Sequence, residues 1–158
     1  MPNYQALKTA LTTTYNGQTD AQIIAAVNAV NVPQAVDIPI SAVTQALALN
    51  GLLPTVKGWA TNPPPVSATV PQAAVTAAQT LGMMIGPPPL FDSLQMSVPA
   101  TAASINSMVT AIVTAGLLPQ ALADGIIALG SQNVSQASLW GFTNGVSEND
   151  LVAARAMP

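Results

Sequence analysis

The segment ATAASINSMVTAIVTA, residues 100–115, has the clearest periodic pattern in the sequence. Its large apolar residues recur at the i, i+3, i+4, i+7 and i+8 positions that share one face of an α-helix, and they are Ile105, Met108, Val109, Ile112 and Val113. Gly116 follows, and glycine often ends helices in a left-handed conformation. We therefore expect a core helix over Ala100–Ala115.

Shorter segments with helical spacing lie on both sides of this helix, separated by Pro and Gly. They are Tyr4–Leu11, a helix from Thr19 that buries Ile23, Ile24, Val27 and Val30, a helix capped by Ser41 that stops at Asn50-Gly51, and then Leu52–Ala60, Gln72–Met84, Pro119–Gly130 and Glu148–Ala156. We predict an all-α fold, a compact multi-helix bundle with Pro-rich connectors. The length is typical of one domain, so we expect a single helical domain over residues 1–158.

Two of these helices have strong start signals. Thr19-Asp20-Ala21-Gln22 matches a capping box, in which the Thr hydroxyl accepts from the third backbone N–H and the Gln side chain returns to the first. Ser147-Glu148-Asn149-Asp150 offers a second such arrangement. Its acids lie in the first turn and Arg155 in the last, as the helix dipole favours.

Prolines define the connectors. Pro63–Pro65 and Pro87–Pro89 force extended geometry and end any helix before them. Rigid connection is the simpler interpretation, and the alternative is a ligand for an aromatic groove. Val36–Ile40 alternates like a short strand, but Pro39 cannot donate to a ladder, so we expect coil over 32–40.

One pattern occurs twice. Ile40–Pro54 ends in Ala-Leu-Asn-Gly-Leu-Leu-Pro, and Ile105–Pro119 ends in Val-Thr-Ala-Gly-Leu-Leu-Pro. Both read as a helix with a left-handed stop, two leucines and a proline that starts the next helix. This order is compatible with a degenerate helical-hairpin repeat, but the general rules of helix termination are the simpler interpretation.

The composition is unusual for a soluble protein. Of 158 residues, 50% are hydrophobic but only 6% are charged and 4% aromatic, and the net charge is −3. About 25% charged residues is typical of globular domains. Because so few charges are available to cover the surface, we expect the chain to be a subunit of an assembly, which includes assembly with its own copies as a homo-oligomer. The alternative is a monomer solvated by Thr, Asn, Gln and Ser.

The sequence offers little for catalysis. It contains no His and no Cys, so the usual proton partner, thiol chemistry and the commonest metal ligands are missing. Asp37, Asp92 and Asp124 are the acids that no helix start explains, and a carboxylate pair among them is the one catalytic alternative. We expect no enzyme, no catalytic or metal-binding residue, no cofactor and no small-molecule substrate.

The composition also argues against several classes of partner and location. Lys8, Lys57 and Arg155 are too few to neutralise a phosphate backbone, so we expect no nucleic-acid binding. The uncharged window Pro99–Ala123 contains two prolines and many hydroxyl residues, so we expect no membrane span. The first residues lack the basic and apolar regions of a signal peptide.

The aromatic residues Trp59, Trp140 and Phe142 lie in Gly-flanked segments. Core anchoring is the simpler interpretation. The alternative is that one of the two tryptophans is an interface hot spot.

Over most of its length the chain resembles a family of small, poorly characterised proteins encoded in the virion structural modules of tailed bacteriophages. The matching segments are Asn3–Lys8, Gly17–Gln22 with Ala25–Asn28, Asp37–Val43 with Leu49–Gly51, Ser97–Thr101, Ser135–Gly141 and Val146–Arg155. No residue in these motifs is tied to a known activity, so no site residue follows from the resemblance.

The resemblance implies a virion component that binds other virion proteins. We accordingly expect a non-enzymatic structural protein of a tailed phage, made in the bacterial cytoplasm and assembled in multiple copies as a tail-associated accessory or adaptor. The alternatives are a capsid decoration protein and a non-virion phage assembly chaperone or host-interaction protein.

Overall fold

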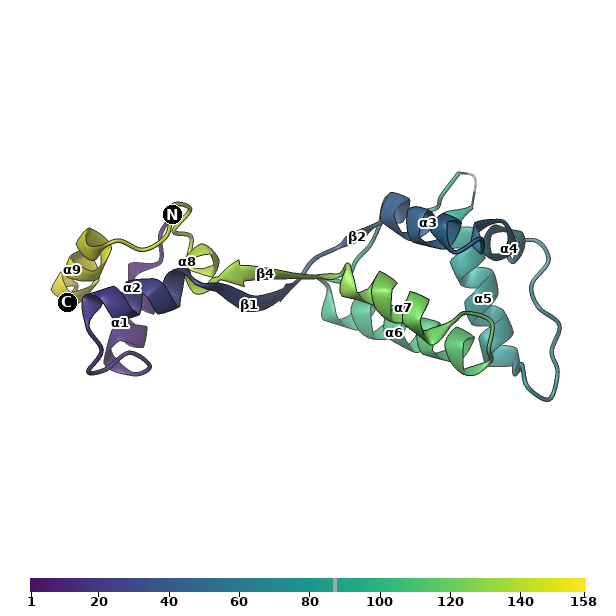
Figure 1. The fold of residues 1–158 in the computed structure, drawn as a ribbon, viewed down its shortest axis with the longest axis horizontal. Coiled ribbons are helices and arrows are strands. Elements are labelled where there is room, and N and C mark those ends of the chain that lie inside the picture. The colour runs from purple at the N-terminus through teal and green to yellow at the C-terminus, as the bar shows by residue number, and fades with distance from the viewer. Residues whose placement is uncertain (87) are drawn as a thin grey trace. The chain divides into compact units, whose positions relative to one another are not determined.

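The computed structural model describes residues 1–86 and 88–158. These residues are mostly helical, with 55% in helices and 10% in small antiparallel sheets. They divide into two compact units (Figure 1). Unit 1 comprises Met1–Gln34 and Asn133–Pro158, and unit 2 comprises Ala35–Gln132.

Unit 1 contains four helices among its described residues: α1 (Tyr4–Thr12), α2 (Asp20–Asn28), α8 (Gln136–Leu139) and α9 (Glu148–Ala156). Both predicted capping boxes are confirmed, at Thr19 with Gln22 and at Ser147 with Asp150. α1 packs against α9, and α2 packs against α8. The apolar faces enclose one small core: Leu7, Ile23, Val27, Ala137, Phe142, Val146, Leu151 and Ala154.

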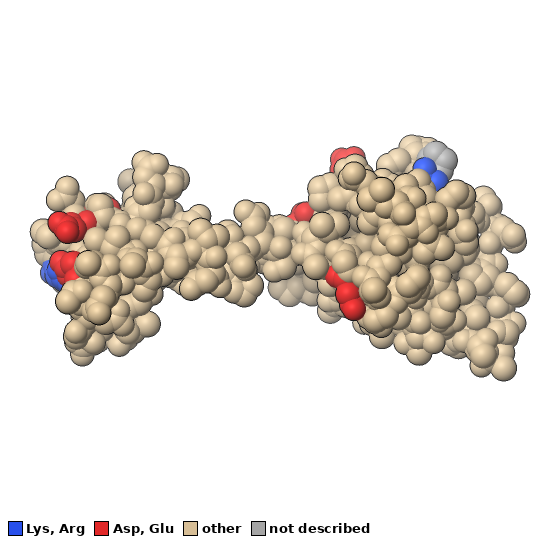
Figure 2. Space-filling model, viewed as in Figure 1, with Lys and Arg blue, Asp and Glu red and all other residues tan. Residues whose placement is uncertain are grey.

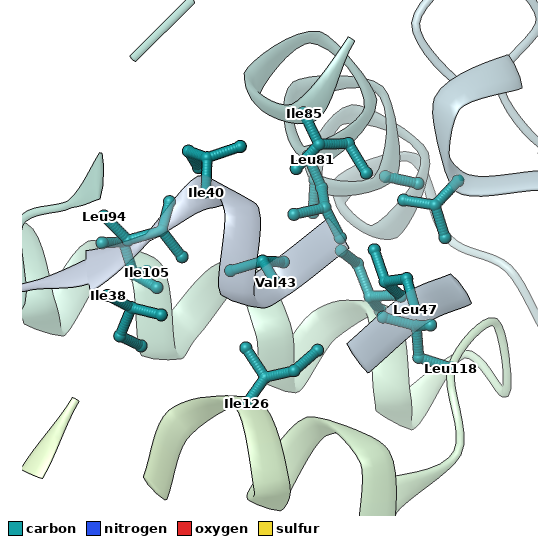
Figure 3. Close-up of a cluster of buried hydrophobic side chains, with 14 of the residues drawn as sticks. Ile38, Ile40, Val43, Leu47, Leu81, Ile85, Leu94, Ile105, Leu118 and Ile126 are labelled. Carbon is teal, nitrogen blue, oxygen red and sulfur yellow. The ribbon is translucent and has the colours of Figure 1, made fainter. Parts of the chain in front are cut away.

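Unit 2 contains β2 (Ile38–Pro39), α3 (Ile40–Leu49), α4 (Leu53–Gly58), α5 (Gln72–Ile85), β3 (Ser93–Leu94), α6 (Pro99–Thr114) and α7 (Gln120–Ala128). In its larger core, Val43 and Leu47 of α3 lie between Leu81 of α5 and Ile126 of α7 (Figure 3). The expected core helix is confirmed within one residue at each end. Only Ile105 and Ile112 of its stripe are fully buried, while Met108, Val109 and Val113 are half-buried.

Glycine allows α5 to pack closely on α4. A Cβ on Gly82 would lie 2.5 Å from the backbone nitrogen of Ala60 and 2.8 Å from the carbonyl oxygen of Val56. These atoms belong to the main chain and cannot rotate away. Any side chain at position 82 would therefore push the two helices apart.

The structure corrects the prediction for residues 32–40, which are not all coil. β1 (Val30–Ala35) pairs with β4 (Ser131–Ser135), and β2 pairs antiparallel with β3, with Ile38 opposite Leu94 and Pro39 opposite Ser93. Both strands of a two-stranded sheet are edge strands, where proline is tolerated. Their partners are distant in the sequence, so no local pattern reveals the pairing. The all-α expectation is thus right only in its coarser form.

Two local predictions are also wrong, and one short helix was not predicted. Val30 is not part of a buried helical stripe, because α2 ends at Asn28 and Val30 is exposed in β1. Ser41 is not a cap, because α3 begins at Ile40 after Pro39. The short helix α8 was not expected, and the hydroxyl of Ser135 caps it by accepting from the backbone N–H of Ser138.

The single domain expected over residues 1–158 stays a prediction, since two compact units can still unfold as one cooperative domain. The triplet Pro87–Pro89 lies partly outside the described residues, while Pro88 and Pro89 are exposed. No helix in the described part of the chain combines the length and hydropathy of a membrane span.

Candidate interaction surface

The side chain of Asp37 hydrogen-bonds to Ser97. Its Oδ1 accepts from the hydroxyl of Ser97 at 2.6 Å and from the backbone N–H of Ser97 at 3.0 Å. The hydroxyl hydrogen bond, helped by the backbone N–H, holds the pKa of Asp37 below its usual value. These two hydrogen bonds connect the residue before β2 with the segment that precedes α6.

The structure does not bring the other two candidate carboxylates into a pair with Asp37. Asp92 is exposed. Its backbone carbonyl oxygen accepts from the N–H of Ile40 at 2.9 Å. Asp37 and Asp92 flank opposite ends of the β2–β3 ladder. Asp124 is exposed on α7 and accepts from the Gln120 side chain at 2.7 Å. Among the described residues, none of the three carboxylates hydrogen-bonds another.

Two acids of unit 1, Asp20 and Asp150, connect its helices through hydrogen bonds. Arg155 of α9 donates to both carboxylate oxygens of Asp20 on α2, at 2.5 and 3.0 Å. This hydrogen bonding lowers the pKa of Asp20 and raises the pKa of Arg155. Asp150 accepts from the Ser147 hydroxyl at 2.6 Å and from the Tyr4 hydroxyl at 2.7 Å, which lowers the pKa of Asp150. The same contact with Asp150 raises the pKa of Tyr4.

Charged residues are few on the face drawn in Figure 2. Acidic and basic groups lie next to one another in unit 1, whereas those of unit 2 lie apart. Residues 1–86 and 88–158 contain no group of three or more acidic, His or Cys residues that could hold a metal ion. Lys8 donates to the carbonyl oxygens of Met157 and Pro158, both at 2.8 Å. The absence of an enzymatic activity and of a cofactor stays a prediction.

The aromatic residues mostly anchor cores. Trp59 is only 6% exposed and belongs to the core of unit 2, and Phe142 is 4% exposed in unit 1. The rings of Tyr4 and Phe142 meet edge to face, with centroids 5.2 Å apart. Trp140 is half-buried against the core of unit 1. The core interpretation is confirmed for Trp59 and Phe142, while a hot spot at Trp140 stays a prediction.

An apolar groove of about 340 Å³ lies between α5 and α6 in unit 2. The wall from α5 consists mainly of small residues: Ala73, Thr76, Ala77, Thr80 and Met84. The wall from α6 consists of residues on and beside the buried stripe of that helix: Thr101, Ser104, Ile105 and Met108. Each set has helical i, i+3, i+4, i+7 spacing, so one face of each helix forms the groove.

A second hollow of about 130 Å³ adjoins one end of this groove and shares Met84, Thr101 and Ile105 with it. Phe91 lines this hollow and is 53% exposed, and its neighbour Leu90 is 63% exposed. One large apolar side chain, Phe91, is therefore half exposed where the groove ends. Isolated exposed apolar residues are common, but an exposed aromatic ring that continues an apolar groove is a candidate interaction site.

Sequence reasoning missed this groove because it assigned the whole apolar face of α6, including Met108, to the core. A usable signal was present: neither α5 nor α6 contains a charged residue. Surface helices normally carry charged residues on the face away from the core. Two long helices without any indicate that their outer faces are not adapted to water alone.

In comparisons with known proteins, no family model matches this chain, and neither a curated protein nor a solved structure is similar to it.

Proposed function

We propose that the chain is a non-enzymatic structural component of a tailed-phage virion, present in multiple copies as a tail-associated accessory or adaptor protein. The observation that carries the proposal is the uncharged, apolar groove between α5 and α6, with the exposed ring of Phe91 at one end. The resemblance of the sequence to phage structural-module proteins supports the same function. Its partners are other virion proteins.

The surface is suited to association by burial of apolar area. Such burial is favourable by about 25 cal/mol per Å² and needs no charged partner. The described carboxylates Asp20, Asp37 and Asp150 hold helices and strands in place through hydrogen bonds. This arrangement fits a protein that positions its neighbours and does not transform a substrate.

The finer fold proposal is a helical bundle in which unit 2 contains a degenerate helical-hairpin repeat. Gly51 and Gly116 both have left-handed φ, at +69° and +71°. After Gly51 the N–H of Leu52 donates to the carbonyl of Leu47 at 2.9 Å, and after Gly116 the N–H of Leu117 donates to Ile112 at 3.0 Å. The same helix stop at equivalent positions supports a duplicated hairpin, α3–α4 and α6–α7.

Location in the particle tests this function directly. Purified phage particles would be labelled with an antibody to the full chain and gold, and imaged by electron microscopy. We expect gold on the tail. Particles from a phage with the gene deleted, or with an unrelated tail gene tagged, provide the matched controls for antibody specificity and access.

The other outcomes separate the alternatives. Gold over the capsid would replace the tail role with head decoration. No gold on intact or opened particles, with abundant protein in infected cells, would contradict a virion role. In that case, binding to an unassembled virion protein would support the assembly chaperone.

A further inference from the structure

We propose that the α5–α6 groove is a self-association surface, in which the α5–α6 face of a second copy of this chain packs across a two-fold axis. The occupant is therefore another unit 2. Residues from both walls would meet their own equivalents or the opposite wall of the partner. A two-fold interface uses the same patch on both copies, so the patch has to be complementary to itself.

The charge distribution favours a second copy as occupant. None of the residues that line the groove is charged, and neither of its two helices carries a charge. A charged patch would repel its own copy, whereas this neutral face meets itself without electrostatic cost. A strongly acidic or basic partner would find no complementary group on the groove walls.

The shape of the groove also fits a self-complementary contact. Ala73, Thr76 and Ala77 leave a depression on the α5 side, while Met84 and Met108 are half-buried and line the same groove with long side chains. Methionine is flexible and fills irregular gaps, so the methionines of one copy can enter the depression of the other. Thr80 and Ser104 add hydroxyls that can remain hydrogen-bonded within their own helices.

The area available predicts a moderate affinity. Helices of 14 and 16 residues are about 21 and 24 Å long, and a pair of them is about 20 Å wide. Such a face covers roughly 450 Å² per copy, or roughly 900 Å² on the two copies together, just below the total of about 1,000 Å² that a specific interface needs. Phe91 extends the apolar area at one end. We therefore expect a dissociation constant in the micromolar range.

This inference deepens the proposed multi-copy assembly and rests on it for its biological meaning. The physical claim can fail separately. A chain that stays monomeric but is found on the tail would remove the self-association surface and leave the virion function intact. A chain that dimerises but is absent from particles would contradict the virion function and leave the self-association surface intact.

The test is sedimentation of the full chain over a range of concentrations, for the unmodified protein and for charge variants. Thr80→Lys with Ser104→Lys places like charges on both walls, and Thr80→Glu with Ser104→Glu does the same with the opposite sign. We expect each variant to weaken dimerisation by at least about tenfold, whichever walls face each other. Asn106→Lys with Thr110→Lys, at exposed positions of α6 outside the groove, is the matched control and should dimerise normally.

Mixing the Lys and Glu variants provides the second measurement. Opposite charges then face each other, so we expect a heterodimer although each variant alone is monomeric. Loss of dimerisation through misfolding would not be rescued in this way. The proposal is overturned if the unmodified chain is monomeric up to about 1 mM, or if the groove charges leave an existing dimer unchanged.

Discussion

Unit 1 and unit 2 are stabilised by different kinds of contact. Unit 1 connects its last helix and the residues after it to its first two helices through polar side chains. Tyr4 contacts Asp150, Lys8 donates to the carbonyl oxygens of residues 157 and 158, and Arg155 donates to Asp20 of α2. The described residues of unit 2 have one comparable long-range pair, Asp37 with Ser97, and a core about twice as large. A small unit buries less apolar surface, so hydrogen bonds contribute more to holding its helices in place. A larger unit is held together mainly by the packing of its core.

The two tryptophans make this difference measurable. Trp59 lies in unit 2 and Trp140 in unit 1, so Trp140→Phe and Trp59→Phe backgrounds each report the unfolding of one unit. Each unit has its own buried core, and we expect two fluorescence transitions in urea. One shared transition in both backgrounds would instead support a single domain over residues 1–158.

The largest expected effect is a cavity in the core of unit 2. Leu47 is fully buried, and Leu47→Ala should lower the free energy of unfolding by about 2–5 kcal/mol. The loss should appear in the Trp59 transition and leave the Trp140 transition in place. Leu7→Ala, at an equally buried position of unit 1, is the matched control and should do the opposite.

A smaller effect tests the close contact of α4 and α5. Gly82→Ala places a Cβ against the main chain of Ala60, and we expect a loss of about 1–3 kcal/mol in the Trp59 transition. Gly125→Ala, within α7 and with open space around it, should stabilise unit 2 by up to about 1 kcal/mol. Equal responses at the two glycines would show that α4 and α5 are not in close contact.

The next prediction concerns a helix cap in unit 1. The hydroxyl of Ser147 accepts from the N–H of Asp150 and donates to its carboxylate, and Ser147→Ala should cost about 1 kcal/mol. Urea titration should show this in the Trp140 transition only. Ser107→Ala, at an exposed position within α6, should have little effect; a cost of similar size there would argue against a cap-specific loss.

The smallest expected difference is in the response to acid. The pKa values of Asp20 and Asp150 in unit 1 and of Asp37 in unit 2 are lowered by their hydrogen bonds. The folded state therefore binds protons more weakly than the unfolded chain, and stability is lost as the pH falls below about 4. Urea midpoints at successive pH values should fall more for Trp140 than for Trp59, and the Asp150→Asn variant should reduce that difference. A larger acid effect on unit 2 would contradict the comparison.

Local signals explain which parts of the fold the sequence could predict. The capping boxes at Thr19 and Ser147 and the glycines at 51 and 116 depend on neighbouring residues, and these features are confirmed. β1 and β4 depend on pairing between distant segments, so the sequence gives no direct indication of them. The groove was missed for a related reason, because periodicity identifies an apolar face without showing whether another helix covers all of it.

The pairing of β1 with β4 has a consequence for how the chain can be rearranged. Unit 2 is an insertion between two segments of unit 1, and the strands that border it place Gln34 and Asn133 on neighbouring strands. A short turn could replace residues 35–132 and reconnect the remaining segments as an ordinary hairpin. Unit 2 is therefore an inserted module. We expect that it can be replaced, lengthened or removed while the helices of unit 1 stay packed together.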